Sequence, residues 1–214
     1  MQVEAPIRAQ AVVFDIGNVL VEWNPERFYD GRYGEDRRRA LFEAVDLHAM
    51  NERIDRGEEF ERIVRETAQA HPAFAAEVGD WHDAWIEMAQ PPIAHSVTLL
   101  RALRVKGIPV HALSNFGRET FAFAQARYPF LTEFDRLFVS GHLGVIKPDP
   151  AIYEALERGT GLAPQAILFT DDRAENVAAA RARGWGAHRF EGPEGWAARL
   201  VEEGLLTESE AAER

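Results

Sequence analysis

The sequence has 214 residues, of which 46% are hydrophobic and 28% charged, and this length accommodates one main domain with an insertion. The formal net charge of -11 argues against a nucleic-acid partner, and no apolar run approaches the roughly 20 residues that a membrane span requires. The chain contains no cysteine, which excludes disulfides, thiolate metal sites and a cysteine nucleophile.

The segment from Ala11 to Leu20, AVVFDIGNVL, begins as a short apolar run that stops at Asp15. A run of this length, rich in β-branched residues, is typical of a buried strand whose carboxyl end delivers the next residue into a loop. In open α/β sheets, ligands bind in the crevice beyond the carboxyl ends of the strands. Asp15 therefore lies where we expect chemistry, and Gly17 and Asn18 follow in the same loop.

From about Pro25 to Pro92 the pattern changes to amphipathic helices, without a convincing strand. Apolar residues recur at helical spacing on three faces: Leu41, Phe42 and Val45; Phe60, Ile63, Val64 and Thr67; and Phe74, Val78, Trp81, Trp85 and Met88. We expect three or four helices that form a small bundle. Because aromatic residues at such spacing usually mark a core, we expect Trp23, Trp81 and Trp85 to serve mainly in packing.

From Ile93 onward, helical and strand patterns alternate. The expected strands are short apolar runs: Pro109 to Leu113, Leu137 to Val139, Ala166 to Thr170 and Ala187 to Phe190. Strands that alternate with helices form a parallel sheet covered on both faces. The sequence thus predicts an α/β fold: a doubly wound parallel sheet formed by residues 1–22 and 93–214, with a helical bundle inserted at 23–92. The polar tail from Thr207 is expected to fray.

Several polar residues follow the predicted strands or begin a helix, and a doubly wound sheet can bring such positions to one edge: Asp15, Ser114, Lys147, Asp171 and Asp172. Carboxylates that share a site repel each other unless a cation lies between them, and hard oxygen ligands suit Mg²⁺. An aspartate beside a metal-bound phosphate is a feasible nucleophile, and Asp15 is the candidate.

Transfer of a phosphoryl group also requires positive charge and hydrogen-bond donors around its oxygens. We expect these from Lys147, from the Ser114 hydroxyl, and from loop amides near Gly17, Asn18 and Asn115. Each position taken alone also fits an ordinary role as a turn, a helix cap or a surface charge. The order of the positions along the chain is the more specific signal.

That order resembles the haloacid dehalogenase-like (HAD) hydrolase superfamily, over nearly the whole chain. Four segments carry the resemblance: FDIGNVLV with Asp15, LSN with Ser114, IKPDP with Lys147, and FTDDRAEN with Asp171 and Asp172. The resemblance implies a Rossmann-like core, a helical cap inserted after the first motif, and Mg²⁺-dependent hydrolysis of phosphate esters through an aspartyl-phosphate. It makes Asp15 the nucleophile, Asp172 a metal ligand, and Asp171 either a further ligand or a support for the ligands.

One position departs from the family pattern. The family's phosphatases usually have a second aspartate two residues after the nucleophile, as general acid and base, where this chain has Gly17. Metal binding there uses the backbone carbonyl, which glycine retains. A general acid typically raises the rate ~10²–10⁴-fold. Without it, the enzyme requires a substrate with a good leaving group or another proton donor, such as Glu22 or a cap residue. Asn51, Arg53 and Asp55 are the cap residues that we expect near the cleft.

The DxGNV wording is similar to a subgroup that includes α-D-glucose-1-phosphate phosphatase and lies near the phosphatase domain of soluble epoxide hydrolases. We therefore favour a Mg²⁺-dependent phosphatase that acts on a small phosphorylated metabolite, such as a sugar phosphate. The alternatives are a metal-free haloacid dehalogenase and a non-catalytic relative that binds phosphate or metal. The first ten residues lack the apolar segment of a secretory signal, so we expect a cytoplasmic protein without membrane contact. We expect it to be a monomer or a homodimer.

Overall fold

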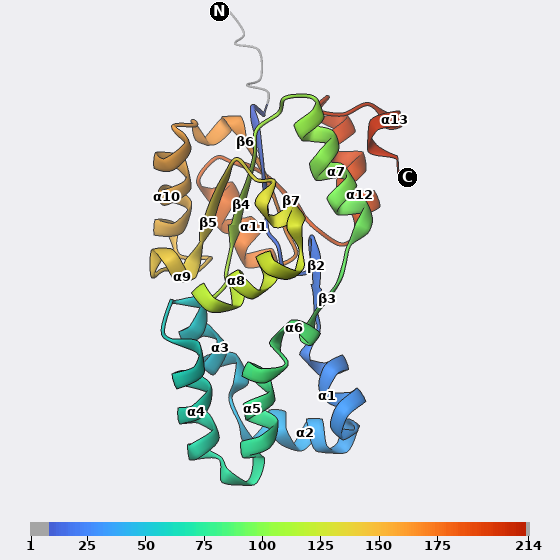
Figure 1. The fold of residues 1–214 in the computed structure, drawn as a ribbon. Coiled ribbons are helices and arrows are strands. Elements are labelled where there is room, and N and C mark those ends of the chain that lie inside the picture. The colour runs from blue at the N-terminus through green and yellow to red at the C-terminus, as the bar shows by residue number, and fades with distance from the viewer. Residues whose placement is uncertain (1–8, 213–214) are drawn as a thin grey trace, which may run out of the picture.

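Five parallel strands form the centre of the computed structural model, which describes residues 9 to 212 (Figure 1). Their order across the sheet is β5-β4-β1-β6-β7. Their bounds are β1 Ala11–Phe14, β4 Val110–Ser114, β5 Arg136–Val139, β6 Ile167–Asp171 and β7 Gly186–Arg189. From β1 at the centre, the chain builds one side of the sheet with β4 and β5, and then the other with β6 and β7. The predicted doubly wound α/β fold is confirmed.

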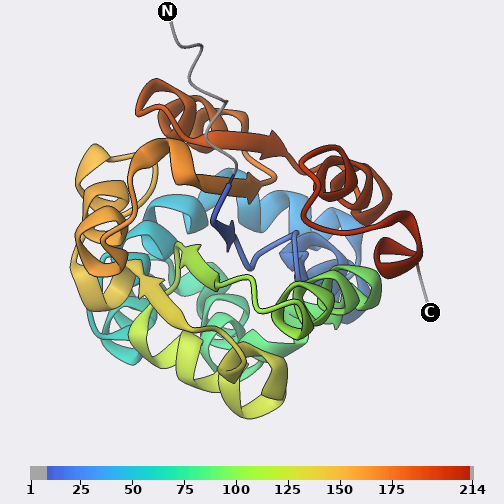
Figure 2. The same ribbon diagram turned by 90° about the horizontal axis from the view of Figure 1, so that it is seen from above.

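Helices cover both faces of this sheet (Figure 2). Because side chains alternate along a strand, Val12 and Phe14 belong to one buried cluster and Val13 to another. The first cluster contains the Phe14 and Trp196 rings, whose centroids lie 5.7 Å apart, and the second contains Phe169. Burial of each such ring stabilises the fold by about 1.5–3 kcal/mol. The helices that supply these clusters are α7 Ala94–Val105, α10 Pro150–Thr160, α11 Ala174–Ala182 and α12 Pro193–Glu202.

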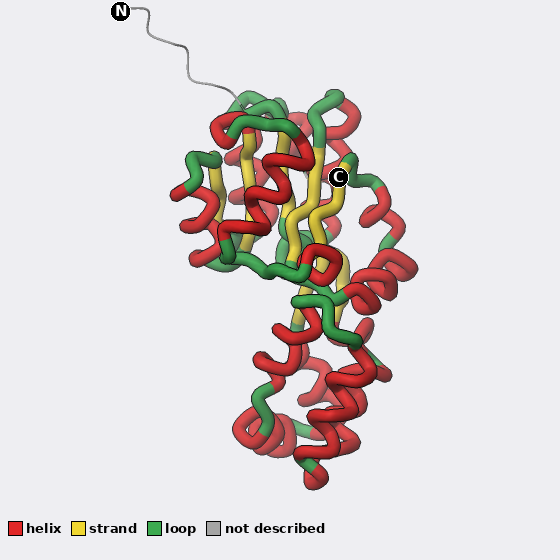
Figure 3. The backbone as a smooth tube through the Cα atoms, turned by 90° about the vertical axis from the view of Figure 1, so that its left-hand side faces the viewer, coloured by secondary structure: helices red, strands yellow, loops and turns green. Residues whose placement is uncertain are grey.

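A helical layer lies beyond the carboxyl ends of the strands (Figures 1 and 3). Its helices are α1 Pro25–Tyr33, α2 Glu35–Ala44, α3 Leu47–Asp55, α4 Phe60–Ala70, α5 Ala75–Asp83 and α6 Trp85–Met88, with a 3₁₀ turn at Pro72–Phe74. We call these helices the cap. The division into a core and a cap at residues 23–92 stays a prediction, and the cap is divided into more helices than expected. The long predicted helix through Trp85 breaks at Ala84, where ψ is 19°.

An antiparallel pair of short strands connects the cap to the sheet: β2 Val21–Trp23 and β3 Ala89–Pro92. The expectation of no strand between residues 25 and 92 was therefore wrong. The β3 sequence, AQPP, contains two prolines and leaves three of its residues exposed, so it has no strand pattern of its own. Tertiary pairing holds it, and hydrogen bonds from the backbone N–H of Asn24 to Met88 and of Ile93 to Leu20 flank the pair.

The end of the described chain also differs from expectation. Residues from Thr207 form a short helix rather than a frayed tail, because Thr207 and Glu210 make a reciprocal capping box. His95 Nε2 contacts the Ala211 carbonyl at 2.8 Å, which fixes this helix against α7. The remaining elements are α8 Arg118–Arg127, α9 Ser140–Leu143 and α13 Glu208–Ala211, with 3₁₀ turns at Pro129–Thr132 and Pro164–Ala166. Within residues 9 to 212, no helix combines the length and hydropathy needed to cross a bilayer.

Candidate active site

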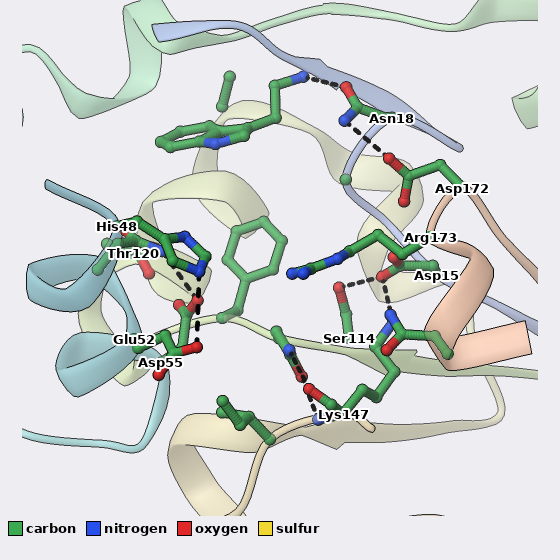
Figure 4. Close-up of a pocket in the computed structure, with 18 of the residues that line it drawn as sticks. Asp15, Asn18, His48, Glu52, Asp55, Ser114, Thr120, Lys147, Asp172 and Arg173 are labelled. Atoms are coloured by element: carbon green, nitrogen blue, oxygen red, sulfur yellow. Dashed lines mark hydrogen bonds and ion pairs between the residues drawn. The ribbon is translucent and has the colours of Figure 1, made fainter. Parts of the chain in front are cut away.

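A cavity of about 540 Å³ lies where the carboxyl ends of β1, β4 and β6 meet cap helix α3 (Figure 4). Seven of the predicted site residues line it: Asp15, Gly17, Asn18, Ser114, Asn115, Lys147 and Asp172. The eighth, Asp171, is fully buried and in contact with Lys147. The topology therefore gathers residues that are up to 157 positions apart in the chain, from Asp15 to Asp172.

The two carboxylate oxygens of Asp15 have different surroundings. Oδ1 accepts hydrogen bonds from the Ile16 backbone N–H at 2.7 Å and from the Ser114 hydroxyl at 2.6 Å, and it pairs with Lys147 Nζ at 2.9 Å. Among the described residues, Oδ2 has no hydrogen-bond partner. The backbone is fixed as well, because the Asp15 N–H donates to the Thr170 carbonyl at 2.9 Å and so continues the β1–β6 pairing. Oδ2 is thus the oxygen available to a ligand.

Lys147 is a buried cation between two buried carboxylates. Its Nζ lies 2.9 Å from Asp15 Oδ1 and 2.6 Å from Asp171 Oδ2, and only 2% of the residue is exposed. Asp171 accepts two further hydrogen bonds from the Asn176 amide, both at 3.0 Å, and one from the Arg173 backbone at 2.8 Å. Burial lowers the pKa of Lys147, but the charges of Asp15 and Asp171 outweigh burial and raise it above its ordinary value. The ammonium therefore stays charged, with both Asp171 oxygens engaged.

Asp172 lies on the side of Asp15 that faces away from Lys147 (Figure 4). Its Oδ2 accepts a hydrogen bond from the Asn18 amide at 3.0 Å, while Asn18 Oδ1 accepts one from the Trp23 backbone at 2.9 Å. Asn18 has a φ of 55°, in the left-handed region that asparagine tolerates better than most residues. The loop after β1 is thereby tied both to β2 and to the loop after β6.

The three aspartates form a group that suits a divalent cation. Asp15, Asp171 and Asp172 each offer a carboxylate oxygen within 4.8 Å of the others. Burial raises the pKa of Asp15 to about 7, with Lys147 opposing and the other aspartates adding to the rise, and burial also raises the pKa of Asp172. A bound cation would relieve this cost, and an all-oxygen set of donors fits Mg²⁺. No hydrogen bond of the described residues uses the Gly17 carbonyl, so it is free to join the set.

Asn115 has a role that the sequence does not reveal. Its amide group pairs with the backbone of Lys147 in both directions: Nδ2 donates to the carbonyl at 3.1 Å, and Oδ1 accepts from the N–H at 2.8 Å. The Asn115 side chain therefore joins the loop after β4 to the loop that carries Lys147, and phosphate binding by the loop amide near Asn115 stays a prediction.

The family model described as haloacid dehalogenase-like hydrolase matches residues 9–184. The chain belongs to this HAD-like family. The sesquiterpene phosphatase astK of Aspergillus oryzae is 27% identical to this HAD-like hydrolase over 183 residues, which cover 82% of this chain and 86% of the relative.

Two solved structures share the fold of this HAD-like hydrolase. A HAD family enzyme of Bacteroides thetaiotaomicron, in complex with magnesium and inorganic phosphate, has a TM-score of 0.68 at 19% identity, over 90% of this chain and 99% of that chain. The L-2-haloacid dehalogenase of Xanthobacter autotrophicus, with chloropropionic acid covalently bound, has a TM-score of 0.62 at 21% identity, over 92% and 84%.

Most of the cavity wall of this HAD-like hydrolase was not predicted from its sequence. One side of the cavity is aromatic and consists of Trp23, Trp85 and Phe116. The ring centroids of Trp23 and Trp85 lie 5.5 Å apart, and those of Trp85 and Phe116 lie 5.6 Å apart. Arg173 extends across the cavity from the side of Asp15 toward the cap (Figure 4). Its position, directly after the paired aspartates, was the available signal. The cap contributes a polar side: His48, Asn51, Glu52, Asp55 and Arg56.

Other candidates lie outside the cavity. Glu22 does not line it and pairs with Arg27 at 2.6 Å. Arg53 is engaged by Glu58 at 2.8 Å and Glu66 at 3.1 Å, so of the three cap residues expected near the cleft only Asn51 and Asp55 line it. Glu22 is thus engaged outside the cavity wall that the other candidates form.

Proposed function

We propose that this HAD-like hydrolase is a Mg²⁺-dependent phosphatase that hydrolyses phosphate monoesters through an aspartyl-phosphate on Asp15. The asymmetry of the Asp15 carboxylate carries the proposal. Oδ1 is fixed by three donors, among them Ser114 and Lys147, whereas Oδ2 has no partner among the described residues. A carboxylate held in this way presents one oxygen for attack and keeps the other in place.

The surrounding residues support transfer of a phosphoryl group. Oδ2 of Asp15 attacks phosphorus, the bond from phosphorus to the ester oxygen breaks, and the leaving group departs with a proton. The Ser114 hydroxyl and the Lys147 ammonium, both within 2.9 Å of Asp15 Oδ1, stabilise the charge on the phosphoryl oxygens. Water then attacks phosphorus of the aspartyl-phosphate, which releases phosphate and restores Asp15.

Asp172 and the Gly17 carbonyl would hold Mg²⁺ beside the Asp15 carboxylate, while Asp171 holds Lys147 in place through its buried ion pair. The ion would neutralise negative charge on the phosphoryl oxygens. Support for magnesium also comes from the Bacteroides thetaiotaomicron enzyme of the same fold, whose structure contains magnesium and inorganic phosphate.

The shape of the cavity and the name of one relative indicate which class of substrate the enzyme accepts. The cavity volume of about 540 Å³ lies in the range of small-molecule sites. The aromatic side of Trp23, Trp85 and Phe116 provides an apolar surface close to the nucleophile, and the Aspergillus oryzae relative is named a sesquiterpene phosphatase. We therefore propose an ester whose organic part has an extended apolar surface, in place of the sugar phosphate expected from the sequence.

The test is the release of p-nitrophenol from p-nitrophenyl phosphate, with Mg²⁺ and with a chelator. The proposal predicts turnover with Mg²⁺ only, abolished in Asp15→Asn and unaffected in the control Asp36→Asn, an exposed aspartate of α2. Because the fold is shared with a haloacid dehalogenase, 2-chloropropionate is assayed in parallel. Halide release without phosphatase activity would replace this proposal, and a lack of both activities would indicate a binding protein.

A further inference from the structure

The loop after β1 offers no acid at the position where the family's phosphatases usually carry one. Gly17 stands there, and a Cβ at residue 17 would meet no atom within 4 Å, so the space beside the nucleophile is open. A leaving alkoxide is a strong base, and its departure without a proton donor is slow. The proposed phosphatase therefore needs a donor from another element of the cavity wall.

We propose that Asp55, the last residue of cap helix α3, is the general acid that protonates the leaving group and the general base that then activates water. This inference rests on the proposed phosphatase function. Asp55 lines the cavity on the side opposite Asp15 and Ser114 (Figure 4). An in-line attack by Asp15 places the leaving oxygen on the far side of phosphorus, toward that wall.

The end of α3 is fixed to the core at this point. The Ser140 hydroxyl donates to the Asp55 carbonyl at 2.7 Å and accepts a hydrogen bond from the Phe116 backbone at 2.9 Å. Gly57, with a φ of 93°, lies so close to Gly141 that a Cβ would approach the Gly141 carbonyl oxygen to 2.4 Å. The general acid would thus be held in place by packing, as catalytic geometry requires.

The carboxyl group of Asp55 is well suited to hold a proton. Its Oδ2 accepts a hydrogen bond from the Asn51 amide at 2.8 Å, and among the described residues it forms no ion pair. Burial raises the pKa of Asp55 to about 7, and the negative charges of Glu52 and Asp15 add to the rise. A hydrogen bond from the Gly117 backbone and the charge of Lys147 lower the pKa but do not outweigh burial. A pKa near neutrality is favourable for a group that donates and then accepts a proton.

Three other titratable groups of the cavity wall are less suitable. His48 and Glu52, on the same helix, have side chains that are 72% and 43% exposed, and they face each other at 3.6 Å. Asp172 is engaged by Asn18 and belongs to the proposed metal site. Asp55 is thus a half-buried carboxyl of the cavity wall, with its backbone fixed by Ser140 and with no cationic partner among the described residues.

The proton balance closes over one turnover. As the bond from Asp15 Oδ2 to phosphorus forms and the ester bond breaks, the proton of Asp55 passes to the leaving oxygen and yields the alcohol. The Asp55 carboxylate then takes a proton from the water that attacks the aspartyl-phosphate. Phosphate leaves, and Asp15 and Asp55 return to their initial states.

The test compares wild type and Asp55→Asn on aryl and alkyl phosphates of increasing leaving-group pKa, from p-nitrophenyl phosphate to phenyl and hexyl phosphate. A lost general acid lowers kcat/KM by ~10²–10⁴-fold on the poorest leaving groups and by less than ~10-fold on p-nitrophenyl phosphate. The dependence on leaving-group pKa therefore becomes steep in the variant. Retained turnover of p-nitrophenyl phosphate also shows that the variant is folded.

Two further variants sharpen the test. Glu61→Gln removes an exposed carboxylate of α4, outside the cavity, and is expected to behave as wild type on every ester. Gly17→Asp, added to Asp55→Asn, uses the open space beside the nucleophile and is expected to restore a shallow dependence. Equal losses on all esters, or none, would overturn the role of Asp55. Wild-type protein that hydrolyses none of the esters would instead overturn the proposed phosphatase function.

Discussion

Replacement of the buried lysine tests the electrostatic core of the site. Lys147→Met retains most of the apolar stem but removes the charge that lies 2.9 Å from Asp15 and 2.6 Å from Asp171. These carboxylates are 7% and 0% exposed, so water cannot take over the role of the ammonium. The variant leaves two buried acids facing each other without a counter-charge.

The expected loss is large. Removal of one partner from a buried ion pair typically costs about 3–5 kcal/mol, because the remaining charge is uncompensated. For a chain of 214 residues, each kcal/mol corresponds to about 2–4 °C in Tm, so the Tm is expected to fall by about 6–20 °C. The loss is smaller at low pH, where the two carboxyl groups can take up protons.

Urea unfolding followed by circular dichroism at neutral pH measures this loss. The chain provides a matched control, since its other lysine, Lys106, is partly exposed and pairs with Glu210 at 2.9 Å. Lys106→Met is expected to cost less than about 1 kcal/mol, as is usual for surface pairs. If Lys147→Met cost no more than Lys106→Met, the result would contradict a lysine held between two buried acids.

Three further changes have expected outcomes. Asp172→Ala should weaken Mg²⁺ binding at least ~10-fold in calorimetric titration, and unchanged affinity would exclude Asp172 as a ligand. Gly57→Ala should cost about 1–3 kcal/mol in urea unfolding, because of its φ of 93° and the Gly141 carbonyl, whereas Gly31→Ala, in open space within α1, should stabilise by about 0.5–1 kcal/mol; equal effects would contradict the described docking. The folded protein keeps the Asp55 proton up to a pKa of about 7, whereas the unfolded chain loses it near the ordinary 3.8. As the pH rises from 4 to 7, the free energy of unfolding of the wild type should therefore fall relative to that of Asp55→Asn, by at most about 1.4 kcal/mol per pH unit. Parallel pH profiles of the two proteins would exclude this titration.

Much of the fold was predictable because local patterns agree with the tertiary structure. The apolar runs before Asp15, Ser114 and Asp171 form strands close to their expected bounds, and the polar residues at their ends gather at one edge of the sheet. The β3 strand was not predictable, because its AQPP sequence acquires strand geometry only through pairing with β2. The helix after Thr207 was predictable in principle, because Thr207 and Glu210 have the spacing of a capping box.

The place of most candidate site residues was predictable, whereas the partners of their side chains were not. Whether Asp171 or Asp172 meets Lys147 depends on the direction of each side chain at the end of β6, and a pattern of two adjacent aspartates does not determine it. The engagement of Asn115 with the Lys147 backbone depends on how two distant loops meet. For the same reason, the sequence could name Asp55 as a cap residue near the cleft but could not distinguish it from Arg53, which turns to Glu58.

The most direct test of the central claim is the identification of the phosphorylated residue. The protein is mixed with p-nitrophenyl phosphate and Mg²⁺, quenched with acid during turnover, digested, and analysed by mass spectrometry. We expect one phosphoryl group on the peptide that contains Asp15, present with Mg²⁺ and absent with a chelator or in Asp15→Asn. Turnover with no phosphorylated peptide, or with the phosphoryl group on another residue, would contradict the account.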